Sequence, residues 1–102
     1  MERVLRHVVM FQFKEDTEAG TIREIEEAFA SLPDKIEAIR AFEWGTDVSV
    51  EGKAGGFSHC FLVTFARVED RDTYLPHPAH QEFVSLVRSH VEKSLVLDYW
   101  TG

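Results

Sequence analysis

Residues 57–68 read FSHCFLVTFARV and have the strongest strand pattern in the chain. The stretch is rich in β-branched and aromatic residues, which suit the pleated, half-buried surface of a sheet. Residues 4–13, VLRHVVMFQF, have the same character, and residues 40–50 and 94–100 are further strand candidates. Gly45 lies inside one of these stretches, where an isolated glycine indicates a bulge or a close backbone approach. The sequence therefore predicts four strands.

Two segments between these strands have the period of an amphipathic helix. Apolar residues recur at helical spacing over residues 22–29, and Pro33 is expected to end this helix near Ser31 or Leu32. A second helix is predicted to begin at Pro78, because the first turn of a helix does not need the N–H that proline lacks. Its apolar stripe consists of Phe83, Val84, Val87 and Val91. Just before it, the segment EDRDTYL is expected to form one helical turn.

The predicted order of elements is β-α-β-β-α-β. This order is the ferredoxin-like split pattern, an α+β fold in which an antiparallel sheet has its helices on one face. Residues 34–39 are expected to form a turn that packs Ile36 and Ile39 inward, and residues 51–56 a flexible connection in a long-looped hairpin. A length of 102 residues, with no repeats or linkers, predicts one domain over 1–102.

The charge balance excludes some classes of partner. Eighteen acidic and eleven basic residues give a formal net charge of -7, whereas nucleic acids and anionic membranes require a basic footprint. The single cysteine, Cys60, cannot form an intramolecular disulfide, which favours a reducing compartment. The first residues, MERVLRHVVMFQF, are too short and too polar to span a bilayer and are interpreted as a strand. We expect a cytoplasmic protein.

Three side chains that can carry protons are expected to share the space between sheet and helices. His80 lies on the apolar stripe of the second helix, in the first turn, where the helix dipole disfavours imidazolium. A neutral histidine there is suited to act as a general base. Tyr74 precedes that helix and could donate to a developing oxyanion. His7 lies on the apolar face of the first strand with Val9 and Phe11.

Other polar residues near this space have both functional and structural interpretations. Asp98 shares a face of the last strand with Val96 and Trp100 and could hold a histidine ring in one tautomer, or it could be a solvated edge carboxylate. His77 stands beside Pro78 and suits a helix cap. A lone histidine on an apolar face is more often a hydrogen-bonded core residue than a catalyst.

No metal site is expected. His77 and His80 stand three residues apart instead of the four of a zincin helix, and no acidic ligand follows at a familiar offset. The segment GKAGG lacks the spacing of a phosphate-binding loop and has no helix directly behind it.

Five segments together resemble one family. They are RHVVMFQFK, FEWGTDVS, GFSHCFLVTF, YLPHPAHQEFV and LVLDYW, in this order along nearly the whole chain. The chain is identified by them as similar to the stress-responsive A/B barrel (Dabb) family. The resemblance implies a homodimer in which two ferredoxin-like sheets face each other as an α+β barrel with the helices outside. Val8 and Met10, on the other face of the first strand, would then meet the partner.

The resemblance also implies a chemistry. A plant member of the family closes a linear polyketide thioester by an aldol condensation without a cofactor, and its catalytic tyrosine and histidine match Tyr74 and His80. The residues that would bind the substrate are His7, Val9, Phe11, Ile25, Phe29, His77 and Asp98. The chain departs from that cyclase at three of its pocket aromatics, which are replaced by Ile25, Glu26 and Phe29, so the substrate is not carried over.

Two function classes therefore stay open. One is a dimer of unassigned reaction, non-catalytic or stress-linked, with a small apolar ligand pocket lined by His7, Tyr74 and His80. The other is a polyketide cyclase of the lyase class that needs no cofactor, with Tyr74 as donor and His80 as general base.

Overall fold

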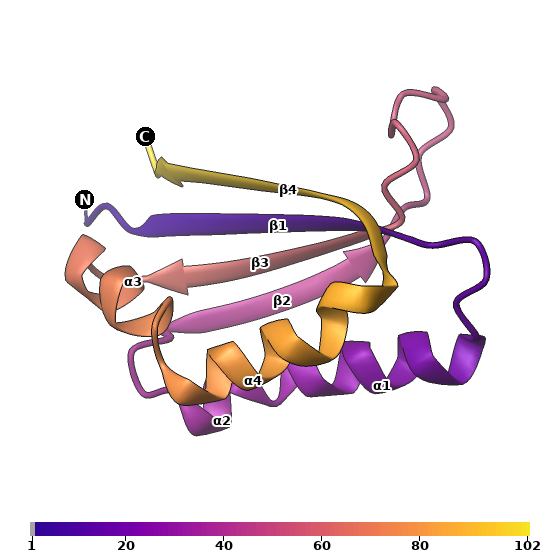
Figure 1. The fold of residues 1–102 in the computed structure, drawn as a ribbon. Helices are drawn as coiled ribbons and strands as arrows, with labels where there is room; N and C mark the ends of the chain where they lie inside the picture. Colours follow the sequence, from indigo (N-terminus) through magenta and orange to yellow (C-terminus); the bar gives the residue numbers. More distant parts are fainter. Residues whose placement is uncertain (1) are drawn as a thin grey trace.

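A computed structural model describes residues 2–102 as a four-stranded antiparallel sheet with helices on one face (Figure 1). The elements are β1 (Leu5–Phe13), α1 (Ala19–Ala30), α2 (Leu32–Lys35), β2 (Ala41–Thr46), β3 (His59–Phe65), α3 (Val68–Tyr74), α4 (Pro78–Val87), the 3-10 turn η1 (Arg88–His90) and β4 (Val91–Trp100). The strand order is β2-β3-β1-β4, and each neighbouring pair is antiparallel. The predicted ferredoxin-like α+β fold is confirmed.

The central position of β1 decides which side chains meet on the helix-covered face. His7 is opposite Val63 of β3 and Asp98 of β4. Residues directly opposite in an antiparallel pair place their side chains on the same face, close enough to interact. The register therefore puts Asp98 beside His7, although the two residues are far apart in the sequence.

The core lies between the sheet and the two longer helices. The alternation of β1 and β3 turns Val9, Phe61 and Val63 toward the helices, where they are buried. Phe29 of α1 stacks on Phe61 with ring centroids 4.3 Å apart and also contacts Phe83 of α4 at 4.6 Å. Burial of one such aromatic side chain contributes about 1.5–3 kcal/mol, so this cluster holds both helices on the sheet.

The chain between α1 and β2 differs from the sequence prediction. α1 ends at Ala30 with Ser31 as its C-cap, in agreement with the predicted end near Ser31 or Leu32. Pro33 lies in the first turn of a separate short helix, α2, where no intrahelical N–H bond is lost. Part of the predicted turn at 34–39 is therefore helical. Ile36 and Ile39 are buried, as predicted.

The hairpin of β2 and β3 is more regular and shorter than predicted. The pairing runs without interruption through Gly45, which is opposite Cys60, and a Cβ at Gly45 would meet nothing within 4 Å. Both predicted alternatives for Gly45, a bulge and a close backbone approach, are therefore wrong. The sheet is irregular instead between Gln12 and Phe13, where β1 pairs with β4. β2 ends at Thr46 and β3 begins at His59. The connecting loop, residues 47–58, extends beyond the sheet on the side away from the helices (Figure 1).

The second half of the chain has two further differences. The predicted single turn before the proline is a helix of seven residues, α3, and Tyr74 is its last residue. Val91 was expected on the stripe of the second helix but is the first residue of β4, because α4 ends at Val87 and η1 turns the chain back. None of the helices within residues 2–102 has the length and apolar character needed to cross a membrane.

Candidate functional site

A cavity of about 490 Å³ lies between the sheet and α4. It is open because β4, at the edge of the sheet, has little helix cover: Val96 faces the helix side and is still 58% exposed. Six of the nine residues predicted for the site line this cavity: His7, Val9, Phe11, Phe29, Tyr74 and His80. The cavity thus combines apolar walls with the three predicted groups that can carry protons, His7, Tyr74 and His80.

The remaining three predicted residues do not line the cavity. Ile25 is fully buried in the core behind it. His77 caps α4, because its Nδ1 accepts a hydrogen bond from the backbone N–H of Ala79 at 3.0 Å. Asp98 stands behind His7 and reaches the cavity only through that ring.

Tyr74 has a hydroxyl without a partner. The side chain is fully buried, and its Oη makes no hydrogen bond within the described part of the chain. Its ring contacts those of His80, at 4.3 Å between centroids, and His7, at 5.8 Å. Burial raises the pKa of Tyr74, so the hydroxyl keeps its proton at neutral pH and stays a donor. A buried polar group left unpaired costs about 1–3 kcal/mol, which a ligand that accepts this hydrogen bond would offset.

His80 is held in one tautomer. Its Nδ1 lies 2.8 Å from the carbonyl oxygen of Leu75, and a carbonyl only accepts, so Nδ1 carries the proton and donates. In the neutral ring Nε2 therefore has the free lone pair. Burial lowers the pKa of His80, as do the charges of His7 and His77, while the Leu75 carbonyl raises it. The predicted preference of His80 for the neutral form is supported by this shift, with burial as its main cause.

His7 is held from the opposite side by a carboxylate. Its Nδ1 is 2.6 Å from Oδ1 of Asp98, which confirms that Asp98 can hold a histidine ring. The other oxygen of Asp98, Oδ2, accepts from the guanidinium of Arg71 at 3.0 Å. Sequence reasoning missed Arg71, because its contact with Asp98 joins residues that are 27 positions apart and depends on the tertiary packing.

A second polar cluster lies outside the cavity. His59 contacts Oε2 of Glu26 through Nε2 and Oγ of Ser58 through Nδ1, both at 2.7 Å. The Trp44 ring is nearly parallel to the His59 ring, with centroids 6.1 Å apart. The cluster ties α1 to the start of β3 and was not predicted from the sequence.

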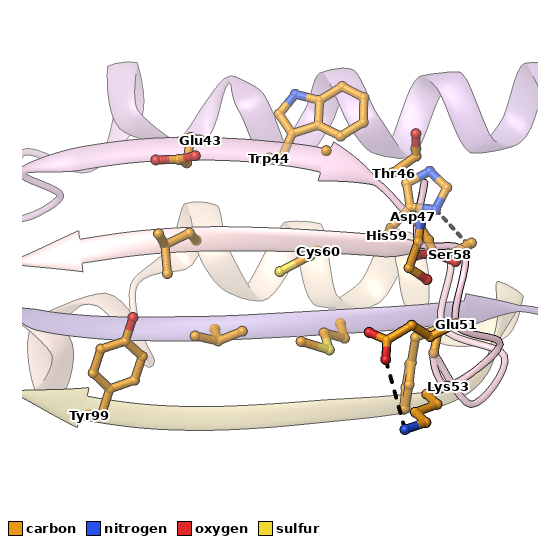
Figure 2. A pocket seen from close by; sticks show the side chains of 17 residues that line it. Glu43, Trp44, Thr46, Asp47, Glu51, Lys53, Ser58, His59, Cys60 and Tyr99 are labelled. Carbon is orange, nitrogen blue, oxygen red and sulfur yellow. Dashed lines mark hydrogen bonds and ion pairs between the residues drawn. The ribbon is translucent and has the colours of Figure 1, made fainter.

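A larger hollow, of about 770 Å³, lies on the sheet face away from the helices. Figure 2 shows Cys60, Glu43 and Tyr99 on this face, with Glu51 and Lys53 of the connecting loop above the sheet. Its lining includes His59 and Tyr99, but both ring nitrogens of His59 already have partners, Ser58 and Glu26. It is therefore a weaker candidate for acid–base chemistry than the cavity beside α4.

The sheet face away from the helices, here called the outer face, nevertheless exposes apolar side chains. Val8, which the sequence placed on this face, is already buried by neighbouring side chains. Leu95 and Leu97 of β4 are 40% and 57% exposed. The apolar surface available to a partner is thus mainly on β4. Among residues 2–102, no group of three His, Cys, Asp or Glu residues is placed to hold a metal ion.

Comparison with known proteins identifies relatives across the whole chain. The family model of the stress responsive A/B barrel domain (Dabb) matches residues 5–101. The stress-response A/B barrel domain-containing protein HS1 of Arabidopsis thaliana is 38% identical over 95 residues, which cover 93% of this chain and 87% of the relative. Olivetolic acid cyclase of Cannabis sativa is 34% identical over 95 residues, which cover 93% of this chain and 94% of the relative.

Solved structures agree with these relationships. Hydroxynitrile lyase from Passiflora edulis superposes with a TM-score of 0.93 and 28% identity, covering 100% of this chain and 96% of that chain. A dimeric ferredoxin-like protein of unknown function from Jannaschia sp. superposes with a TM-score of 0.79 and 26% identity, covering 94% and 97%.

Proposed function

The chain belongs to the stress-responsive A/B barrel (Dabb) family, and on this premise we propose that it acts without a cofactor on a small, largely apolar carbonyl compound. The ligand would occupy the cavity beside α4. Tyr74 would donate a hydrogen bond to its carbonyl oxygen, and His80 would act as general base. His7, Val9, Phe11 and Phe29 would line the binding site.

The unpaired hydroxyl of Tyr74 is the observation that carries the proposal. In a protein that used this residue only for packing, phenylalanine would fill the same space without the cost of a buried, unsatisfied donor. A ligand oxygen at this point would restore the missing hydrogen bond. The hydroxyl is thus positioned for an acceptor that residues 2–102 do not supply.

The proposed reaction is the removal of a proton from the carbon next to the carbonyl. The lone pair on Nε2 of His80 takes this proton, and the electron pair of the broken C–H bond moves into the carbonyl as an enolate. Tyr74 stabilises the negative oxygen by its hydrogen bond. The lowered pKa of His80 keeps the base unprotonated near neutral pH. The enolate carbon can then attack a second carbonyl of the same ligand, and the alkoxide that forms takes the proton back from His80, which returns to its neutral form.

The names of two relatives support chemistry of this kind. Olivetolic acid cyclase and hydroxynitrile lyase are enzymes, and their relationship to this chain extends over the segments that carry Tyr74 and His80. If the ligand is a polyketide-like chain, intramolecular attack of its enolate on a second carbonyl closes a ring. Fold similarity alone does not fix a reaction, so the support rests on these two side chains.

We further propose that the functional unit is a homodimer. Leu95, Leu97 and Tyr99 form an apolar strip on the exposed outer face of β4, and monomeric proteins rarely leave large contiguous patches of this type in water. A relative of known structure is described as dimeric. A second copy covering the outer face would leave the cavity beside α4 on the opposite side of each sheet.

The direct experiment is a turnover assay with poly-β-keto thioesters of short and long acyl chains, together with a panel of hydroxynitriles. The wild type is expected to convert at least one compound, and Tyr74→Phe and His80→Ala should each reduce its kcat by about a hundredfold or more. Tyr99→Phe and His90→Ala make the same chemical changes outside the cavity and should retain activity. Folding of each variant is checked by circular dichroism.

Failure of the wild type on both panels, with its dimer intact, would count against catalysis. A thermal shift assay with the same compounds then separates the two remaining cases. Stabilisation that is lost in Tyr74→Phe would indicate a non-catalytic ligand-binding protein, whereas the absence of any shift would reject the pocket itself.

A further inference from the structure

We propose that Arg71 is a positioning residue of this site: through Asp98 it fixes the His7 ring so that Nε2 presents its lone pair to the cavity. The inference rests on the proposed function, since it gives His7 the role of a second acceptor beside Tyr74. It concerns a residue that does not itself line the cavity.

The contacts form one chain from α3 to β1. The guanidinium of Arg71 donates to Oδ2 of Asp98 at 3.0 Å, and Oδ1 of Asp98 accepts from Nδ1 of His7 at 2.6 Å. Arg71 also donates to Oδ1 of Asp72 at 3.2 Å and 3.3 Å, which fixes the other edge of the guanidinium. The side chains of Arg71 and Asp98 are about three-quarters shielded from solvent, at 25% and 27% exposure.

Each oxygen of Asp98 thus has a separate partner. A carboxylate on an edge strand is ordinarily free to rotate about χ2 and to exchange its protein contacts for water. A charge-assisted bond from a planar guanidinium removes this freedom, because it anchors one oxygen and leaves the other directed at His7. The carboxylate then selects the tautomer with the proton on Nδ1.

The opposite edge of the His7 ring faces the cavity. His7 is 4% exposed, but its Nε2 has no hydrogen-bond partner among the described residues and is not among their fully buried unpaired atoms. The neighbouring Tyr74 ring meets the His7 ring edge-on at 5.8 Å. With Nδ1 committed to Asp98, the nitrogen that a ligand can reach is an acceptor.

This arrangement narrows the class of ligand. The cavity presents acceptor nitrogens from His7 and His80 beside the buried, unpaired hydroxyl donor of Tyr74. The complementary ligand has a carbonyl acceptor with an acidic proton or a hydroxyl close to it, as a β-dicarbonyl compound has in its keto and enol forms. A plain hydrocarbon or an isolated ketone would leave one of the histidine acceptors unpaired.

Nitrogen NMR of the histidine rings tests the positioning role without any assay of activity. When the His7 ring is neutral, long-range ¹H–¹⁵N spectra of the wild type should show Nδ1 protonated and Nε2 bare. Arg71→Ala should convert these signals to those of mixed tautomers, and Arg71→Lys should restore them in part because it keeps a cationic donor. Arg67→Ala is the matched control, since Arg67 is at the other end of α3 and its nearest carboxylate, that of Asp70, is 4.0 Å away.

Unchanged His7 signals in Arg71→Ala would overturn the proposal. If that variant does not fold, Arg71→Gln and Arg71→Lys decide the question, because both keep a hydrogen-bond donor at this position and remove the guanidinium fork. Wild-type signals in both the lysine and the glutamine variants would mean that the charge and fork of arginine are not required, which also overturns it.

The kinetic readout separates this inference from the proposed function. If the chain is an enzyme, Arg71→Ala should lower kcat about tenfold or more with a smaller change in KM, because the ligand still fits the cavity. If the wild type shows no turnover but its His7 tautomer depends on Arg71, the positioning role is supported and the catalytic function is rejected. The opposite result is turnover that depends on Tyr74 and His80, with kcat and the His7 spectrum unchanged in Arg71→Ala. It would support the catalytic function and reject the positioning role of Arg71.

Discussion

The rings of Tyr74 and His80 lie 4.3 Å apart, between centroids, at the junction of α3 and α4. Local chain geometry produces this pair: Tyr74 is the last residue of α3, His80 is in the first turn of α4, and the carbonyl of Leu75 between them accepts from His80 Nδ1 at 2.8 Å. The packing of the junction on the sheet then buries Tyr74 and partly buries His80, beside His7. The donor and the base are therefore neighbours before any ligand enters.

Removal of the Tyr74 hydroxyl should stabilise the protein. Tyr74→Phe keeps the packing of the ring and eliminates a buried hydroxyl without a partner, so the free energy of unfolding should rise by up to about 1–2 kcal/mol. Urea denaturation at pH 7 measures the change. Tyr99→Phe, on the outer face, serves as the comparison and should change it little. Loss of a buried, paired hydroxyl costs about 1–3 kcal/mol. A decrease of about 1 kcal/mol or more in the free energy of unfolding of Tyr74→Phe would therefore mean that the hydroxyl has a hydrogen-bond partner.

The pKa of His80 should lie below its ordinary value of 6.5. A folded-state pKa below the unfolded one means that the native state prefers the neutral ring. The stability contributed by this preference is complete above pH 6.5 and is lost as the pH falls through the lowered folded pKa. NMR titration of the His80 ring gives the value directly. A midpoint above 6.5 would show that the Leu75 carbonyl outweighs burial and the neighbouring histidines.

The outer face of the sheet should mediate self-association. Light scattering at micromolar concentration should give twice the chain mass of 11.7 kDa. Leu97→Glu places a charge in the centre of the exposed strip on β4 and should shift the protein to monomer, because an unpaired buried charge is strongly unfavourable in an interface. Glu27→Gln, on the exposed surface of α1, should leave the mass unchanged. A monomeric wild type would contradict the dimer.

The Glu26–His59 pair should contribute to stability rather than to the proposed reaction. Glu26→Ala leaves the buried His59 with one partner fewer, and the free energy of unfolding should fall by about 1.5–3 kcal/mol, as for other hydrogen bonds to charged groups. Glu24→Ala, at an exposed position on the same helix, is the control and should have a small effect. Ligand binding in the cavity should be retained in both variants; if Glu26→Ala abolished it in a folded protein, the cluster would belong to the site.

Local patterns in the sequence determined the elements and their order. The period-two alternation of residues 4–13 and the helical stripe through Phe83 and Val87 each depend on neighbours within a few positions, so they can be recognised without the fold. The same patterns placed His7 and His80 on faces that point toward each other. The errors occurred at boundaries such as Gly45 and Val91, where turns, bulges and strand ends compete over one or two residues.

Only the tertiary structure decided which of these residues meet. The register between β1 and β4 sets Asp98 opposite His7, and a shift by one residue would have turned Asp98 to the other face. The partnership with Arg71 requires, in addition, that α3 brings the guanidinium of Arg71 within hydrogen-bond distance of Asp98 on β4. Whether the Tyr74 hydroxyl has a partner depends on every atom around it. Such long-range contacts arise from packing in three dimensions, so they cannot be predicted from local periodicity in the sequence.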